Sequence, residues 1–145
     1  MKCYRAYRLI TDAQGAAEVI TPFLKGWFLH KLEFENPTAA DKLYSGARLT
    51  VYTHERGAER KLIFQGDADI SEVPFRMGEI YTAWNGTTMK ASTQYWQDVQ
   101  PERLKIAIVR NSGTAAADKY IDATVILSTN EAGCSSDAGL PEGFK

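Results

Sequence analysis

The stretch of sequence that decides the fold occurs twice. Residues 32–53 read LEFENPTAADKLYSGARLTVYT, and residues 107–128 read AIVRNSGTAAADKYIDATVILS. Each begins with an extended apolar run that reaches an asparagine (Asn36 or Asn111), and each passes through Thr-Ala-Ala and Asp-Lys into a second run that contains Thr-Val. We predict two equivalent strand–loop–strand units, which favours two related sheets over a meandering barrel. The alternative is coincidence, because Asn, Thr, Ala, Asp and Lys are common in loops.

The rest of the chain predicts further short strands separated by turn residues, with no long amphipathic helix. Asn85-Gly86 is typical of a two-residue hairpin turn, and residues 94–102 are either a short helix or an irregular loop. We therefore predict an all-β fold, an antiparallel β-sandwich of about eight to nine strands with at most one short helix. The predicted strands are Cys3–Ile10, Trp27–Glu35, Ala47–Thr53, Lys61–Gln65, Asp69–Phe75, Glu79–Trp84, Thr87–Thr93, Leu104–Arg110 and Ile121–Ser128.

Period-2 alternation in the four strongest strands predicts one buried cluster between two sheets. Its members are Phe28, Leu32, Phe34, Leu49, Val51, Ile106, Ile108, Val125 and Leu127.

The last sixteen residues differ from the rest of the chain. Residues 1–129 are predicted to form the sandwich domain, and residues 130–145 a polar tail that docks on a neighbouring subunit. Such a tail cannot form a core of its own, so ordering it requires a surface to lie on. Leu140 and Phe144 are its sizeable apolar anchors, and Arg5 and Arg8 on the first strand are predicted to contact partners as well.

Composition narrows the possible classes of protein. The net charge is −1 and no run of Lys and Arg occurs, which argues against nucleic-acid binding. No apolar run approaches the roughly 18–20 residues that span a membrane, and the first residues do not resemble a signal peptide. Synthesis in the cytoplasm without a signal peptide is therefore expected. Cys3 and Cys134 are expected to be free thiols, although a disulfide between them stays open.

No catalytic motif is evident in the sequence. His30 lies on an apolar face, where a hydrogen-bonded core role is favoured, and His54 lies at a charged turn. Asp67 and Asp69 could bind Ca²⁺, which uses oxygen ligands, but beside Gly66 they are interpreted as part of a solvated turn. No phosphate loop, dinucleotide motif or zinc spacing occurs. The sequence therefore predicts no enzyme activity, no cofactor and no metal.

Aromatic residues gather around the predicted hairpin and the segment after it. Trp84, Tyr95 and Trp96 are the candidates for exposure there. Flat aromatic side chains near loops form platforms for sugars or anchors for protein partners. These residues are therefore the predicted contacts for a ligand or partner, and a carbohydrate is one possible ligand. The alternative is that they fill the core.

Two short stretches resemble known families. The sequence around Asn36-Pro37-Thr38 and at residues 111–116 (NSGTAA) resembles immunoglobulin-like sandwich domains, although their Cys…Trp…Cys core is absent. Residues 78–92 (GEIYTAWNGTTMKAS) resemble small β-sandwich proteins of tailed-phage virions. The resemblance implies an immunoglobulin-like or jelly-roll-type sandwich in a virion.

Three hypotheses for function follow. The first is a non-enzymatic structural protein of a tailed-phage particle (a decoration, fibre, neck or tail protein) that binds itself and other particle proteins. It would be located in the virion, and otherwise in the cytoplasm. The second is a carbohydrate- or ligand-binding module that uses Trp84, Tyr95 and Trp96. The third is a small β-barrel enzyme similar to a cyclase, with an apolar cavity.

Overall fold

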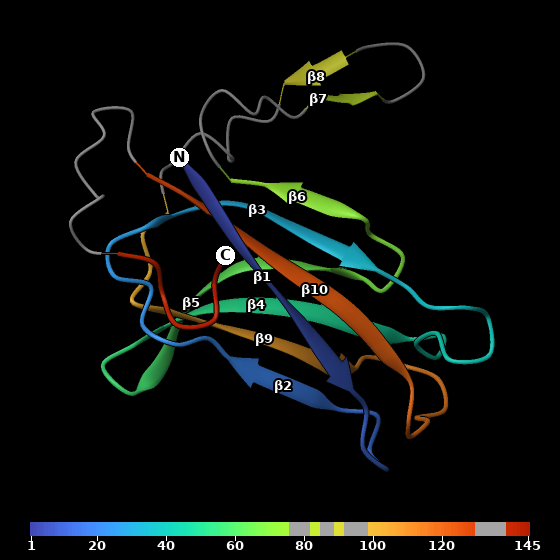
Figure 1. Cartoon of the computed structure of the whole chain (residues 1–145). Coiled ribbons are helices and arrows are strands. Elements are labelled where there is room, and N and C mark those ends of the chain that lie inside the picture. The colour runs from blue at the N-terminus through green and yellow to red at the C-terminus, as the bar shows by residue number, and fades with distance from the viewer. Residues whose placement is uncertain (76–81, 85–88, 92–98, 130–138) are drawn as a thin grey trace.

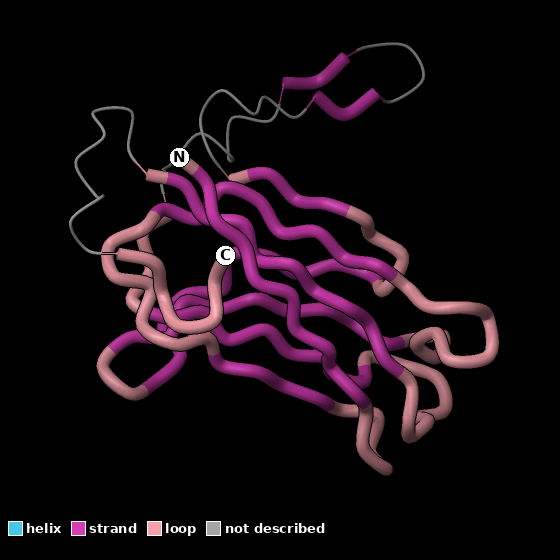
Figure 2. The backbone as a smooth tube through the Cα atoms, viewed as in Figure 1, coloured by secondary structure: helices cyan, strands magenta, loops and turns pink. Residues whose placement is uncertain are grey.

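The computed structural model describes residues 1–75, 82–84, 89–91, 99–129 and 139–145. These residues form two four-stranded antiparallel sheets packed face to face, and no helix occurs among them (Figure 2). No membrane-spanning helix is therefore found among the described residues. The predicted all-β sandwich is confirmed.

The two sheets, named sheet A and sheet B, alternate along the chain (Figure 1). Sheet A has the order β1-β10-β3-β6 and sheet B the order β2-β9-β4-β5. With the hairpin β7–β8 set aside, every connection crosses between the sheets except the β4–β5 hairpin. This is the connectivity of a jelly roll, which is built from two Greek keys. The strands of sheet A are β1 (Lys2–Ile10), β10 (Tyr120–Ser128), β3 (Phe28–Glu35) and β6 (Glu72–Pro74), and those of sheet B are β2 (Ala17–Ile20), β9 (Arg103–Arg110), β4 (Ala47–Glu55) and β5 (Ala58–Asp67).

Two local features differ from the predicted strands. The strand β2 was missed, because its four residues are too few to show a period, and it forms only by pairing with β9. A hairpin is present as β7 (Thr82–Trp84) paired with β8 (Met89–Ala91), but Trp84 pairs with Met89, so four residues separate the paired ends where a two-residue Asn-Gly turn was predicted. In the segment left open as helix or loop, Val99 forms a single bridge to Leu29.

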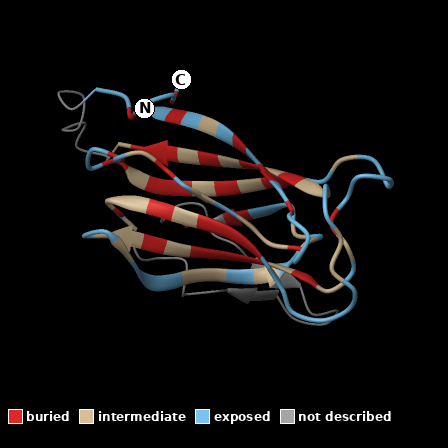
Figure 3. Ribbon diagram, turned by 90° about the horizontal axis from the view of Figure 1, so that it is seen from below, coloured by how far each residue is buried: buried red, intermediate tan, exposed pale blue. Residues whose placement is uncertain are grey.

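The predicted core lies between the sheets with one correction. Eight of the nine predicted residues are buried, and buried residues alternate with exposed ones along the strands (Figure 3). Phe28 is only half-buried. The ladder with β10 places Lys31 opposite Ile126 but Leu29 opposite Leu127, so His30 is an extra residue. This β-bulge reverses the alternation, and Leu29 takes the inward position predicted for Phe28.

The repeated units occupy equivalent places in the two sheets. β3–β4 runs from sheet A to sheet B, and β9–β10 runs back from sheet B to sheet A. Val51 pairs with Ile106 in sheet B. The counterpart of Val51 in the second unit, 74 residues later, is Val125, and the counterpart of Ile106 in the first unit, 74 residues earlier, is Leu32. Val125 and Leu32 pair with each other in sheet A. This reciprocal register is what an internal two-fold relation requires. It supports the predicted equivalence of the two units.

The internal two-fold relation also holds for side chains outside the repeated segments. Lys105 of sheet B bonds Glu18 at 3.1 Å, and the corresponding Lys31 of sheet A lies 3.6 Å from Glu72. Both glutamates lie on the edge strand next to the lysine's own strand, at matching register positions. The internal two-fold thus relates four strands of each sheet, with β1 in the place that β5 takes in sheet B.

The two repeated loops lie side by side at one end of the sandwich. The backbone amides of Asn111 and Ser112 both donate to the Gly46 carbonyl, at 2.9 and 3.2 Å, and the Lys119 ammonium donates to the Ala40 carbonyl at 2.8 Å. Gly46 has a φ of +94°, and a Cβ there would lie 2.1 Å from the Ser112 carbonyl oxygen. A glycine is therefore required where the loops meet.

Truncation of a central core residue tests the sandwich. Ile106 is fully buried, so Ile106→Ala should lower the free energy of unfolding by about 2–5 kcal/mol, through lost burial and the cavity left behind. Urea denaturation followed by tryptophan fluorescence measures this. Leu62→Ala, at a 42% exposed residue, is the matched control and should change the free energy by less than about 0.5 kcal/mol. Equal effects of the two changes would contradict the packing described.

Candidate functional site

The outer faces of the two sheets each carry a hollow, and the two hollows occupy equivalent places. In sheet A the hollow surrounds Thr124, and in sheet B it surrounds Thr50, its counterpart in the repeat. Both threonines lie on an inner strand and alternate with buried valines, so they point away from the core. The two faces therefore share the same backbone arrangement, and the side chains around each threonine decide what that face can contact.

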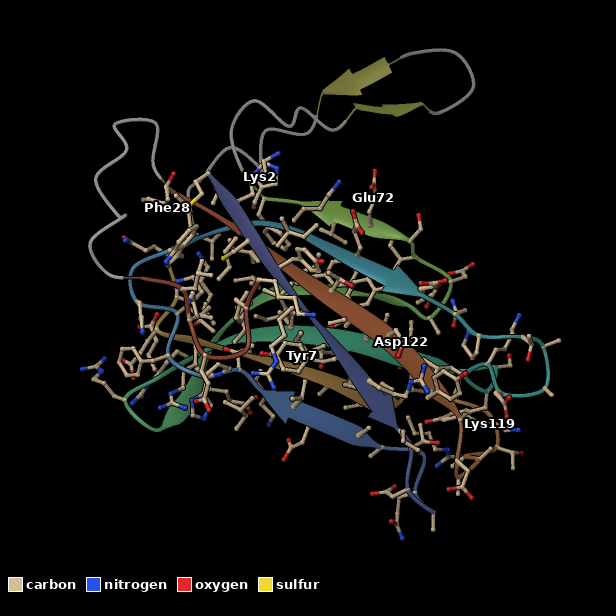
Figure 4. The ribbon with its side chains drawn as sticks, viewed as in Figure 1. Lys2, Tyr7, Phe28, Glu72, Lys119 and Asp122 are labelled. Atoms are coloured by element: carbon tan, nitrogen blue, oxygen red, sulfur yellow. The ribbon has the colours of Figure 1, made fainter. Side chains whose placement is uncertain are left out.

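The hollow of sheet A has a mostly apolar lining and a volume of about 480 Å³. Tyr4 is 52% exposed, and the half-buried Ile126 lies opposite it across the ladder. Two charged residues lie at its edge, Lys2 of β1, which Figure 4 labels, and Glu33 of β3. The residues that line the hollow are Lys2, Cys3, Tyr4, Ala6, Glu33, Thr124 and Ile126.

The hollow of sheet B has a volume of about 530 Å³ and a polar rim. Lys105 crosses part of it, with its ammonium 3.1 Å from a Glu18 carboxylate oxygen and 3.5 Å from Glu59. The hydrogen bond to Glu18 is the main reason that the pKa of Lys105 is raised. This ammonium is therefore charged at neutral pH, with two carboxylates to balance it. Arg48, Tyr52 and other polar side chains complete the rim.

The structure places the two predicted contact arginines differently. Arg8 lies on the outer face, where its guanidinium donates to both carboxylate oxygens of Asp122, at 2.8 and 3.1 Å, and lies 4.1 Å from the centre of the Tyr120 ring. Arg5 faces the open edge of the sandwich and donates to the Glu142 carbonyl at 2.9 Å. Arg5 thus holds its own C-terminal segment, while Arg8 is exposed on sheet A.

The described part of the tail packs on its own domain, which corrects the expectation for Phe144. This residue is 6% exposed and belongs to the core, rather than being free to anchor on a neighbour. The Lys145 amide donates to the Tyr4 carbonyl at 3.0 Å, and the Tyr4 amide donates back at 3.1 Å. The open edge of β1 therefore supplies the surface that the tail needed. Residues 139–145 belong to the domain, and residues 130–138 lie outside the described part.

Further contacts fix the start of this segment. The Trp27 indole Nε1 donates to the Gly139 carbonyl at 2.9 Å, and the Lys25 ammonium donates to the Leu140 carbonyl at 3.2 Å. Gly143 has a φ of +78°, and a Cβ there would lie 2.5 Å from the Arg5 guanidinium. Of the two predicted anchors, Leu140 stays accessible, at 44% exposure.

The predicted aromatic site cannot be placed. Tyr95 and Trp96 lie outside the described residues. Trp84 ends β7, and only its backbone is described. A ligand or partner contact at these three residues stays a prediction.

The described residues show no group of three or more His, Cys, Asp or Glu side chains that could hold a metal ion. His30 is buried at the bulge of β3, as expected for a core histidine. Cys3 is free and buried, and burial raises the pKa of its thiol to about 11. A thiol with so high a pKa is a poor nucleophile at neutral pH.

The hollows themselves were not predicted from the sequence. Each is formed by side chains from strands that are distant in the chain, so their neighbours are known only once the strand order is known. The sequence signal that could have located them is the repeat of Thr-Val, at Thr50-Val51 and Thr124-Val125. A threonine between inward-facing residues must lie on the outer face of its sheet.

Comparison of the chain with protein-family models, with curated proteins and with solved structures found no match. The site must therefore be interpreted from its own geometry.

The docking of the tail can be tested by truncating its buried anchor. Phe144→Ala should lower the free energy of unfolding by about 1.5–3 kcal/mol, the value of burying a phenylalanine, because the chain end can detach instead of leaving a cavity. Leu140→Ala is the control from the same segment and should have little effect, since Leu140 is 44% exposed. Thermal and urea unfolding measure both. An unchanged stability of Phe144→Ala would contradict the docking.

The reactivity of Cys3 tests its burial. In a Cys134→Ser variant, which isolates Cys3, the folded protein should react with iodoacetamide on the order of a hundredfold more slowly than the urea-unfolded chain at pH 8. The native state also holds this proton more tightly than the unfolded chain. Stability should therefore fall as the pH rises from the ordinary value of 9.0 toward 11. Equal alkylation rates would show that the thiol is accessible.

Proposed function

We propose that the protein is a non-enzymatic structural protein that works by self-association, as a decoration, fibre, neck or tail component of a tailed-phage particle. The single observation that carries the self-association is the apolar hollow on the outer face of sheet A. The particle is supported by the resemblance of residues 78–92 to small virion sandwich proteins.

The exposure of apolar side chains on sheet A favours an interaction surface. An antiparallel sheet with one face in water normally carries polar side chains there. Here β1 presents Tyr4 at 52% exposure and Ile10 at 55%, and Met1 at its start is 73% exposed. Of these three residues, Tyr4 lines the hollow. An exposed apolar side chain at a hollow with charges at its rim is typical of protein interaction sites.

A second copy of the chain fits this face. Identical subunits most often associate about a two-fold axis, in which the same surface contacts itself. The rim of the hollow carries both charge signs, since Lys2 and Glu33 both line it. A two-fold axis through the hollow brings the cation of one copy toward the carboxylate of the other, which gives electrostatic complementarity. In such a contact the apolar centre of the hollow on each copy is buried away from water.

The described residues give no support to a catalytic role. They contain no candidate metal group, and their buried cysteine is protonated at neutral pH. The jelly-roll connectivity does not decide function, because one fold carries many activities. The proposal therefore rests on the surface of sheet A and not on the fold.

A charge placed in the hollow tests self-association. Tyr4→Arg should weaken association at least about tenfold, because it places a second cation beside Lys2 in a desolvated contact. Sedimentation equilibrium over a concentration series measures the dissociation constant. Val109→Arg is the matched control, since Val109 is 39% exposed on the opposite face. A monomeric wild-type protein at its highest soluble concentration would overturn the proposal, as would equal effects of the two changes.

A further inference from the structure

The floor of the sheet B hollow is made of small side chains. Thr50 on β4 and Ala107 on β9 lie directly opposite each other in the ladder and both face outward. They are only 5% and 6% exposed, because longer side chains surround them. In the same row across the sheet, Gln65 follows Thr50 and Glu18 follows Ala107. Two short residues between two long ones create the depression.

The adjoining rows close the depression at both ends. On one side Arg48 lies opposite Val109, and on the other Tyr52 lies opposite Lys105. The rim therefore combines guanidinium, ammonium and amide donors with carboxylate and amide acceptors. The apolar part of the lining includes Ala107, Val109 and the ring of Tyr52.

The charges of this rim disfavour an anionic ligand. Its two cations, Arg48 and Lys105, stand against three carboxylates, those of Asp12, Glu18 and Glu59. Lys105 is already bonded to two of these carboxylates. An anionic ligand would meet no excess of positive charge. A wholly apolar ligand would leave the rim groups desolvated and unpaired, which is costly.

The equivalent place in sheet A shows that this polar rim is specific to sheet B. Where sheet B has Ala107 opposite Thr50, sheet A has Glu33 opposite Thr124. On the other side of the threonine, sheet A has Ala6 where sheet B has Gln65. One frame thus carries two different surfaces, and only the sheet B surface offers many donors and acceptors around small floor residues.

We propose that the outer face of sheet B is a binding site for a neutral carbohydrate. Sugar hydroxyl groups both donate and accept hydrogen bonds, which matches the mixed rim, and the C–H face of a sugar ring matches Ala107 and the Tyr52 ring. The volume of about 530 Å³ lies within the roughly 300–1,000 Å³ of small-molecule sites. This site is independent of the self-association proposed for sheet A, and its lining residues are other than the Trp84, Tyr95 and Trp96 proposed from the sequence.

The test uses the full-length protein and a matched pair of alanine substitutions. A glycan array of neutral oligosaccharides identifies candidate sugars, and each is then titrated into ¹⁵N-labelled protein. Backbone amide shifts should change at Thr50, Gln65 and Ala107. Ala107→Leu fills the floor and should abolish the change. Ala6→Leu, an equally conservative substitution on the outer face of sheet A, should leave binding unchanged. Gln65→Ala removes one rim amide and should weaken binding about threefold to tenfold.

The other outcomes overturn the site. Absence of binding to every array member, with no amide shift at the highest soluble sugar concentration, rejects carbohydrate binding. Binding that survives Ala107→Leu places the ligand elsewhere, including the region of Trp84. Selective binding of anionic glycans contradicts the argument from charge. Sedimentation of the same variants keeps the two proposals apart, because Ala107→Leu should leave self-association unchanged whether or not the sugar site exists.

Discussion

The pairing of Leu32 with Val125 and of Val51 with Ile106, at the centre of the two sheets, is the contact on which the structure depends. All four side chains are fully buried and belong to the core cluster between the sheets. Because side chains alternate along a strand, a slip by one residue would exchange the core with the surface. The register that turns Val51 and Ile106 inward therefore also turns Thr50 and Ala107 outward. The packing of the core thus determines the floor of the surface hollow.

The internal two-fold relation explains how one frame can carry two kinds of surface. Equivalent positions share the features that hold the sheets together, such as the lysine–glutamate contact between an inner strand and its edge neighbour. They differ in the side chains that face solvent. Tyr4 and Ala6 give sheet A an apolar surface suited to a protein neighbour, whereas Gln65 and Tyr52 give sheet B hydrogen-bonding groups. In the functions proposed here, assembly and ligand binding would use opposite faces without competing for the same residues.

Alternation was enough to predict most strands and the core, because a half-buried strand must place its apolar side chains on one face. It failed at Phe28, since the extra residue His30 is fixed by the partner strand and leaves no local signature. It failed at β2 for a related reason, because four residues show no period and the strand exists through its partner.

The tail was misplaced because only its own apolar groups were considered. The unpaired backbone of Tyr4 at the sheet edge, and a space in the core for Phe144, could not be inferred before the strand order was known. The hollows depend on long-range neighbours in the same way. Glu18 and Gln65 flank one row because β2 and β5 are the two edges of sheet B. Apart from the bulge at His30, the side chains that a strand buries are thus predictable from its own sequence, whereas its neighbours in the sheet are not.

The pairing of β1 with β10 has a consequence for the synthesis of the chain on the ribosome. β1 and β10 pair antiparallel although no turn connects them directly, and at one end of the pair the Thr129 amide donates to the Met1 carbonyl at 3.1 Å. In sheet B the corresponding pair, β4 and β5, is closed by a short turn and can form as soon as it is made. β1 instead pairs with β10, so it emerges before the other described strands and must wait until β10 has followed them. Until β10 is made, the apolar residues Cys3, Tyr7 and Leu9 of β1 remain exposed. The strand that needs the longest loop closure is therefore also the one most exposed to aggregation during synthesis.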